Sequence, residues 1–242
     1  MTEKKTATLQ TIRDTLRFHQ AMGIDEYPCN QDVQHFLQRV ARARNLSPPG
    51  TAPAGIENLE AEITACSLCG LARGPLGRVP GKGCTGCRLM IVGDWSSQSG
   101  TFSPATLFGP EEDVMLWKMI TAMGLQPDQV YVTNCLKCCP RDPGVIDEKC
   151  EESCFSFLAR EIAAVGPRII CAMGEMPVRV LMGNKQPLSR LRGRFDKYRY
   201  QSGQAVAVMP TFHPRFLLQH QEMKKATWSD LLAIKRRLDE SS

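Results

Sequence analysis

The sequence contains no long apolar run: none of its segments approaches the roughly 18 consecutive apolar residues that a membrane-spanning helix needs. Its first ten residues, MTEKKTATLQ, lack the apolar core of a secretory signal peptide. It also has little charge imbalance, because a formal net charge of +5 over 242 residues is mild. We therefore expect a cytoplasmic protein of a reducing compartment, without a membrane partner. The charge permits nucleic-acid binding but does not predict it.

Cysteine is abundant instead, with eleven in the chain. In a reducing compartment this number favours metal or cluster binding over disulfides. Five of these cysteines follow a predicted strand that ends at Asn134: Cys135, Cys138, Cys139, Cys150 and Cys154. A loop broken by proline and glycine, and then the start of a helix, complete this segment. One stretch thus joins a polar residue at a strand end to candidate metal ligands.

Strands and helices alternate along most of the chain. We predict strands at 88–93, 129–134, 168–174 and 205–211, and helices at 113–125, 148–164, 175–183 and 227–238. This alternation predicts an α/β fold with three layers, α/β/α, around a central four-stranded, mostly parallel sheet.

The first part of the chain has a different character. Residues 7–22 and 31–44 have the apolar spacing of two short amphipathic helices, and the segment NLSPPGTAPAG (45–55) has the composition of a linker. We therefore expect a helical N-terminal extension and linker over residues 1–55, followed by the α/β domain over residues 56–242.

Polar residues stand at the ends of three predicted strands. They are Asp94, Asn134 and His213. Each alone has a simpler structural explanation, as a helix cap, a turn former and a packed histidine. Ligands of open α/β sheets bind at the carboxyl ends of the strands, so the three together predict a site.

The cysteine spacing leaves two kinds of metal site open. Cys66 and Cys69 form one CxxC pair and Cys84 and Cys87 form another, which is the pattern of a zinc ribbon, although the gap of 14 residues is slightly short. One CxxC pair with two distant thiols is also a common way to hold an iron–sulfur cluster.

Several segments then occur in an order that is typical of one family: CSLC, VPG, RLMIVGD, LFG, VTNCLKCCP, LRGRF and PTFHPRFLL. Over about residues 57–238 the chain resembles the family-4 uracil-DNA glycosylases, the iron–sulfur branch of that superfamily. The resemblance implies a monofunctional DNA glycosylase of base excision repair. Such an enzyme flips uracil or another altered base out of DNA and hydrolyses its N-glycosidic bond with water. The implied partner is DNA with a damaged or deaminated base, and the expected form is a monomer.

The resemblance also assigns residues. Asp94 would position water and stabilise the sugar cation, and His213 would donate to O2 of the leaving base. The base would be bound by Asn134 together with Gly93, Trp95, Leu107 and Phe108, and phosphates would be contacted by Arg192, Arg194 and Arg215. A 4Fe–4S cluster, with zinc as the alternative, would be held by Cys66, Cys69, Cys138 and Cys154.

The first motif departs from the family pattern Gly-Glu-Ala-Pro-Gly, because here the chain runs Gly93-Asp94-Trp95-Ser96-Ser97. Asp shortens the carboxylate arm by one methylene, and Trp95 is bulky where the family keeps a small residue. Leu107 stands at the position of a stacking Phe. These changes predict a target other than uracil, weak activity on uracil, or a nucleic-acid-binding protein without catalysis. A redox or cluster-carrier protein and a zinc-ribbon regulator are the further alternatives.

Overall fold

The computed structural model of the chain describes residues 54–240, apart from residues 75, 99–101, 141, 143, 145, 185, 201 and 202. The two helices predicted at 7–22 and 31–44 lie outside the described residues, so the N-terminal extension stays a prediction. The end of the predicted linker is described and is helical, because helix α3 (Ala54–Thr64) begins there.

The centre of the fold is a six-stranded sheet with the strand order β1-β3-β2-β4-β6-β5. Its four inner strands run parallel: β3 (Val130–Asn134), β2 (Leu89–Gly93), β4 (Ile169–Met173) and β6 (Ala205–Thr211). These are the four predicted strands. Two antiparallel edge strands, β1 (Lys82–Gly83) and β5 (Asp196–Arg199), were not predicted. Neither strand has the run of apolar residues that predicts a strand, because β1 has only two residues and β5 buries only Tyr198.

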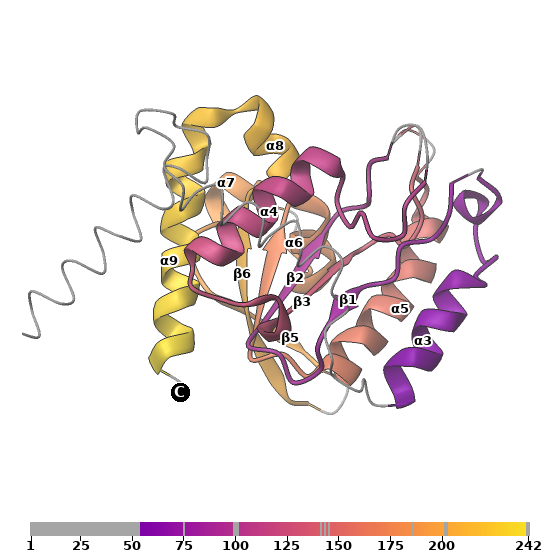
Figure 1. Cartoon of the computed structure of the whole chain (residues 1–242), viewed down its shortest axis with the longest axis horizontal. Helices are drawn as coiled ribbons and strands as arrows, with labels where there is room; N and C mark the ends of the chain where they lie inside the picture. The colour runs from indigo at the N-terminus through magenta and orange to yellow at the C-terminus, as the bar shows by residue number, and fades with distance from the viewer. Residues whose placement is uncertain are drawn as a thin grey trace, which may run out of the picture.

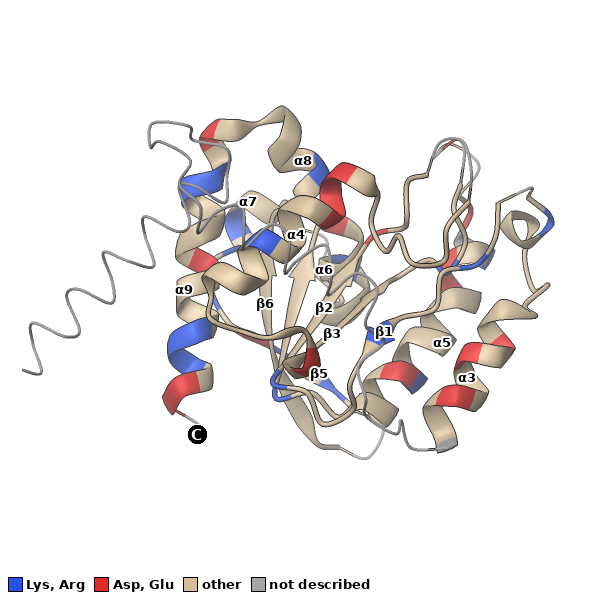
Figure 2. Ribbon diagram, in the orientation of Figure 1, with Lys and Arg blue, Asp and Glu red and all other residues tan. Residues whose placement is uncertain are grey.

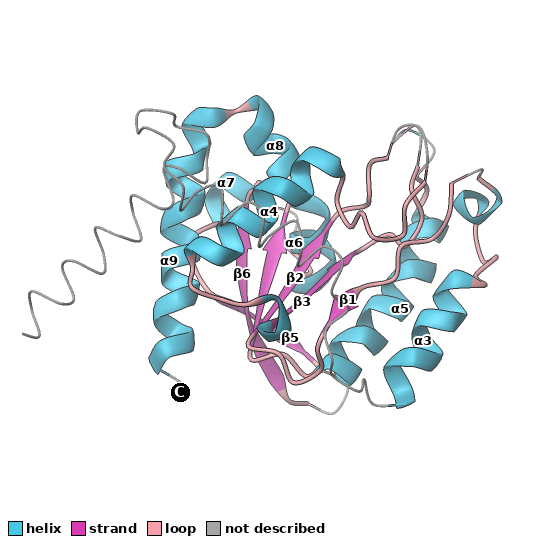
Figure 3. Ribbon diagram, viewed as in Figure 1, coloured by secondary structure: helices cyan, strands magenta, loops and turns pink. Residues whose placement is uncertain are grey.

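Helices cover both faces of this sheet (Figures 1 and 3). One face packs against α3, α5 (Glu148–Val165), α6 (Glu175–Met182) and the short α7 (Leu188–Leu191). The other packs against α4 (Pro110–Ala122), α8 (Pro214–Gln219) and α9 (Lys224–Glu240). Short 3-10 turns occur at η1 (Gly70–Arg73), η2 (Pro127–Gln129) and η4 (Gln221–Met223).

Two hydrophobic cores result, one on each face, and β2 shows why. Met90 and Val92 belong to the core under α5, whereas Leu89 and Ile91 belong to the core under α4. Successive side chains of a strand point to opposite faces, so a strand with no polar residue needs cover on both. The predicted three-layer α/β/α architecture is confirmed.

Helix α4 begins at Pro110, three residues earlier than residue 113, where the sequence predicted it. Proline is favoured in the first helical turn, since its missing N–H would have no partner there. Three acidic residues follow it, Glu111, Glu112 and Asp113 (Figure 2), and negative charge near a helix N-terminus interacts favourably with the helix dipole.

The register of the parallel strands aligns their carboxyl ends. Gly93 of β2 pairs with Asn134 of β3, and Met173 of β4 pairs with Thr211 of β6. The residues that follow these strands therefore meet at one edge of the sheet. None of the helices in the described part of the chain has the length and apolar character that crossing a membrane requires.

Candidate active site

Three buried polar atoms at this edge of the sheet have no hydrogen-bond partner. They are Oδ1 of Asp94, Oδ1 of Asn134 and Nε2 of His213. An unsatisfied buried polar group costs about 1–3 kcal/mol, so three in one place indicate a site shaped for a polar ligand. The three residues are those that the strand ends predicted. Their surroundings show how they come together.

Gly93 and Phe108 connect the three side chains. A Cβ atom on Gly93 would lie 2.5 Å from the Phe108 ring and 2.7 Å from Oδ1 of Asn134, so the strand must carry glycine here. The Phe108 ring in turn packs on the His213 ring, with the ring centroids 4.6 Å apart. Asp94 directly follows Gly93 in the chain. The structure thus brings the predicted catalytic and base-binding residues into one contiguous group.

The Asn134 side chain is fully buried and held in one orientation. Its Nδ2 donates to the backbone carbonyl of Leu107 at 2.6 Å. Because a carbonyl can only accept, the NH₂ group must face Leu107 and Oδ1 must face away from it. The amide therefore presents one acceptor and one remaining N–H donor, and the acceptor has no partner in the chain.

Asp113 fixes the loop that holds Asn134, and the sequence analysis missed it. Its two carboxyl oxygens accept from the backbone N–H groups of Leu107 and Phe108, each at 2.8 Å. Burial raises the pKa of Asp113 to about 6. An acidic residue in the first turn of a helix, just after an LFG segment, was the available signal, since such residues often bond the chain that enters a helix.

His213 is buried and bonded so that it acts as a donor. Its Nδ1 accepts from the backbone N–H of Arg215 at 3.1 Å, which caps helix α8. Burial, with a smaller contribution from the Arg215 charge, holds the pKa of His213 well below its usual range. The neutral ring with Nδ1 as acceptor carries its proton on Nε2. That N–H is the atom without a partner.

The Asp94 carboxyl lies at the N-terminus of helix α6. The backbone N–H of Met176 lowers the pKa of this carboxyl, and a Cβ atom on Gly174 would lie 2.5 Å from its Oδ1. Gly174 has a φ of 110°, which side chains rarely adopt. Burial raises the pKa of Asp94 to about 7, although the nearby Arg215 charge opposes this rise. Near neutral pH the group is therefore poised between acid and carboxylate.

Arg215 belongs to the site rather than to an open surface. It donates to Oε1 of Glu112 at 3.4 Å and to the Trp95 carbonyl at 3.0 Å. Its guanidinium also lies 4.9 Å from the centre of the Trp95 ring. Arg215 therefore covers the residue that departs from the family pattern, and Glu112 is a further residue that the sequence analysis missed.

The other two predicted phosphate contacts differ from one another. Arg192 makes a two-point ion pair with Asp230, at 3.0 and 2.7 Å, and lies over the Phe212 ring. It therefore has a structural role in holding α9 to the segment that follows α7. Arg194 is exposed on the surface.

The four predicted cluster ligands gather on the α5 side of the sheet. Burial raises the pKa of Cys138 to about 12, and the neighbouring thiols of Cys154, Cys69 and Cys66 add to this effect. The backbone N–H of Lys137 lowers the pKa of Cys154, and the Arg78 charge lowers the pKa of Cys138. Four thiols with donors and a positive charge beside them suit an iron–sulfur cluster.

The zinc-ribbon arrangement is not assembled in the described part of the chain. The Cys84 thiol donates to the carbonyl of Asp128, and Cys87 lies near Cys84 and the N–H of Tyr131. Among the described residues, no three His, Cys, Asp or Glu side chains are grouped closely enough for one metal ion.

Comparison with known proteins agrees with this geometry. The family model described as the uracil DNA glycosylase superfamily matches residues 80–232, more than half of the chain. Three curated relatives are type-4 uracil-DNA glycosylases. The enzyme of Sulfurisphaera tokodaii is 27% identical over 74% of this chain and 83% of its own length. The enzyme of Archaeoglobus fulgidus is 26% identical over 74% of this chain and 91% of its own length. The enzyme of Thermotoga maritima is 24% identical over 73% of this chain and 91% of its own length.

The matched region runs from the VPG turn before β1 into helix α9. It includes all the strands of the sheet and the three residues whose buried polar atoms lack a partner. Fold, strand-end residues and sequence match agree, and the chain belongs to the uracil DNA glycosylase superfamily.

Proposed function

We propose that this protein removes uracil from DNA by hydrolysing the bond between the base and C1′ of the sugar. Membership in the superfamily makes the chain an enzyme that hydrolyses N-glycosyl bonds. The observation that carries the choice of substrate is the set of three unpartnered polar atoms, on Asp94, Asn134 and His213. A flipped base supplies a partner for each of the last two, and the sugar or a water supplies one for the first.

Asn134 would read the base. Its Oδ1 accepts from N3–H of uracil, and the remaining N–H of its amide donates to O4. Cytosine presents an acceptor at N3 and a donor at the neighbouring amino group, so both contacts would become repulsive. The bond from Nδ2 to Leu107 prevents the amide from turning over to suit cytosine.

His213 and Asp94 would stabilise the two charges that develop as the bond breaks. The sugar becomes positive and the leaving base becomes an anion. Neutral His213 donates its Nε2–H to O2 of that anion, and no proton transfer is needed. Ionised Asp94 faces the cation and orients the attacking water, whose proton it can accept.

Other parts of the chain would hold the DNA and the fold. Exposed Arg194 is suited to a phosphate contact. Cys66, Cys69, Cys138 and Cys154 would hold an iron–sulfur cluster, which would cross-link the loop after β3, helix α5 and the segment that follows α3. The partner is DNA that contains a deaminated base.

The direct test is cleavage of single- and double-stranded oligonucleotides that contain one uracil, hypoxanthine, xanthine or oxidised pyrimidine. Alkali breaks the strand wherever a base has been removed. Breakage at uracil supports the proposal, and breakage at another base alone would make Trp95 and Leu107 a change of specificity. Tight binding without breakage would indicate a nucleic-acid-binding protein that has lost catalysis.

The Asn134→Ala variant should lose base selectivity. We expect kcat/KM on uracil to fall at least about tenfold and the preference for uracil over cytosine to disappear, because both reading contacts are lost. The same oligonucleotides measure both quantities. Asn184→Ala is the matched control, since Asn184 bonds the N–H of Gln186 in the loop after α6. Unchanged selectivity in Asn134→Ala would refute the assigned pocket.

The activity should depend on pH through Asp94. The pKa of this group is raised to about 7, and its carboxylate form is the active one, so activity rises with pH and levels off above that value. Below it, kcat/KM should fall about tenfold per pH unit. Burial holds the pKa of His213 well below its usual range, so we expect no second pH dependence from this group near neutrality. Asp94→Asn should be slower by about 100-fold at high pH and show no such dependence. A wild-type profile that stays flat from pH 5 to 9, which spans about two units on each side of neutrality, would contradict this role.

A further inference from the structure

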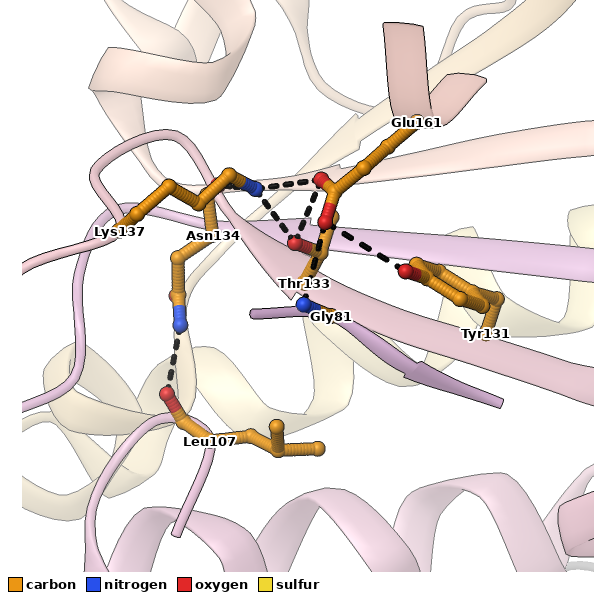
Figure 4. A network of polar contacts seen from close by, with 7 residues as sticks. All are labelled: Gly81, Leu107, Tyr131, Thr133, Asn134, Lys137 and Glu161. Carbon is orange, nitrogen blue, oxygen red and sulfur yellow. Dashed lines mark hydrogen bonds and ion pairs between the residues drawn. The ribbon is translucent and has the colours of Figure 1, made fainter. Parts of the chain in front are cut away.

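A buried ion pair lies directly behind Asn134. The Lys137 ammonium and the Glu161 carboxylate contact each other, and their side chains are 1% and 0% exposed (Figure 4). Lys137 also donates to Oγ1 of Thr133 at 2.7 Å and to the backbone carbonyl of Asn134 at 2.8 Å. All three ammonium protons therefore have an acceptor. None of the roles derived above uses this pair.

The Glu161 carboxylate is equally well bonded. Its Oε1 accepts from the backbone N–H of Gly81 at 3.1 Å and from the Tyr131 hydroxyl at 3.4 Å. Its Oε2 accepts from Thr133 at 2.9 Å as well as from Lys137. A buried network in which every member is satisfied defines one geometry, since any displacement breaks several bonds at once.

Stability alone does not account for such a pair. Removing two charges from water is costly, and replacing both partners of a buried ion pair by uncharged residues often leaves stability unchanged or raises it. What the charged pair provides here is a fixed position for the groups that it contacts. One of these is the backbone of the base-reading residue.

Asn134 is held by its place at the end of β3, where it pairs with Gly93 of β2, and by two further contacts, of which the ion pair supplies one. Nδ2 of its side chain is bonded to Leu107, and its backbone carbonyl is bonded to Lys137. Figure 4 shows these two contacts on opposite sides of the residue. The pairing of β3 with β2 fixes the rest of the Asn134 backbone, and the Lys137 contact fixes its carbonyl, so these contacts together define where the unpartnered Oδ1 points.

The Lys137–Glu161 pair also lies next to the predicted cluster ligands. The Lys137 carbonyl accepts from Val79 at 2.6 Å, the Lys137 backbone and charge lower the pKa of Cys154, and the next residue is Cys138. On α5, Glu161 follows Cys154 by seven residues, which is about two helical turns and places both on one face. The turn after β3 and helix α5 are therefore joined at two places, by the thiols and by the ion pair.

We propose that the Lys137–Glu161 pair is a positioning device that sets the direction of the Asn134 side chain and links it to the turn that carries Cys138. This rests on the proposed function for its effect on catalysis, since it assigns Asn134 as the base reader. The placement of the Asn134 backbone by the pair is independent of that function.

The test is the double variant Lys137→Met/Glu161→Gln. It leaves no lone buried charge, and the amide that replaces the Glu161 carboxylate keeps an oxygen that can accept from Gly81 and Tyr131. We expect a folded, iron-containing protein whose kcat on uracil falls at least tenfold with KM little changed. Its discrimination against cytosine should fall as well. Hydrogen exchange of the backbone amides at 134–138, measured without DNA, should be at least tenfold faster than in the wild type.

Arg160→Met is the matched control, because Arg160 precedes Glu161 on α5 and pairs with Glu62 on the surface, where both side chains are about half exposed. It should change neither quantity. If the double variant does not fold, Thr133→Val, which removes one contact to each partner, is examined by the same two measurements. In whichever variant folds, wild-type kcat and wild-type exchange would overturn the proposal.

The two proposals fail in different ways. A wild-type protein that breaks no oligonucleotide would end the proposed function, whereas the exchange rates would still show whether the pair holds the Asn134 backbone. Slow cleavage in the double variant with wild-type exchange would also overturn the positioning role, because the loss would then have another origin.

Discussion

Replacing His213 by alanine should lower kcat on uracil-containing DNA by about 100- to 1,000-fold, the usual cost of removing one donor to a developing oxyanion. The reason is the orientation of the ring: Arg215 occupies Nδ1, so the proton must sit on the buried Nε2, which has no partner in the chain. Single-turnover cleavage of a uracil oligonucleotide, with enzyme in excess, measures the chemical step.

His220→Ala is the control for this variant. His220 lies seven residues further along, and its side chain is 47% exposed. It should cleave at the wild-type rate. A His213→Ala protein that folds and retains full activity would show that the leaving base is stabilised by another group. His213→Gln tests the same point more finely, since an amide N–H partly replaces the lost donor.

The second large effect concerns the cysteines. Cys138→Ala should yield a colourless protein that has lost nearly all of its iron, because this thiol lies among those of Cys66, Cys69 and Cys154. Metal-binding free energy is also folding free energy. Losing about 4 kcal/mol from a domain of this size lowers Tm by roughly 10 °C. Iron analysis, visible absorbance and thermal unfolding measure the three consequences.

Cys84→Ala separates the iron–sulfur ligand set from the zinc-ribbon alternative. Cys84 bonds the Asp128 carbonyl, away from the other group, so its loss should leave the iron content unchanged. Zinc in place of iron, together with its loss in Cys84→Ala, would mean that the ligand set is Cys66, Cys69, Cys84 and Cys87 instead.

The inner strands and the residues at their ends could be predicted because they follow from short-range patterns. Apolar runs such as RLMIVG need cover on both faces, and parallel strands then bring their carboxyl ends to one edge. That topology is enough to place Asp94, Asn134 and His213 together. The edge strands β1 and β5 could not be predicted because neither has an apolar face of its own.

The contacts that orient the site could not be predicted, since each joins residues that are distant in the sequence. Glu112 and Arg215 are 103 residues apart, and Lys137 and Glu161 are 24 apart. A charged residue in a sequence is most often a surface residue, which is why Arg215 was predicted to contact phosphate. The structure gives it partners on the loop that follows β2 and on α4.

The structure also bears on the shortened carboxylate of the first motif. Asp94 reaches the N-terminus of α6 because Gly174 leaves room for it there. Trp95 directly follows Asp94 and is covered by Arg215, which also lowers the pKa of Asp94. The two departures from the family pattern therefore share one partner, and their effects should not be additive when they are reversed.

Gly93 limits how this enzyme could change its substrate. Even one methyl group at this position would meet both the Asn134 amide, at 2.7 Å, and the Phe108 ring that packs on His213, at 2.5 Å. A substitution of Gly93 is therefore not expected to yield activity on a new base, although Gly93 lies at the centre of the candidate site. Libraries that aim to redirect the enzyme should keep Gly93 constant and vary positions 95 and 107, where side chains already differ from the family and the backbone imposes no such collision.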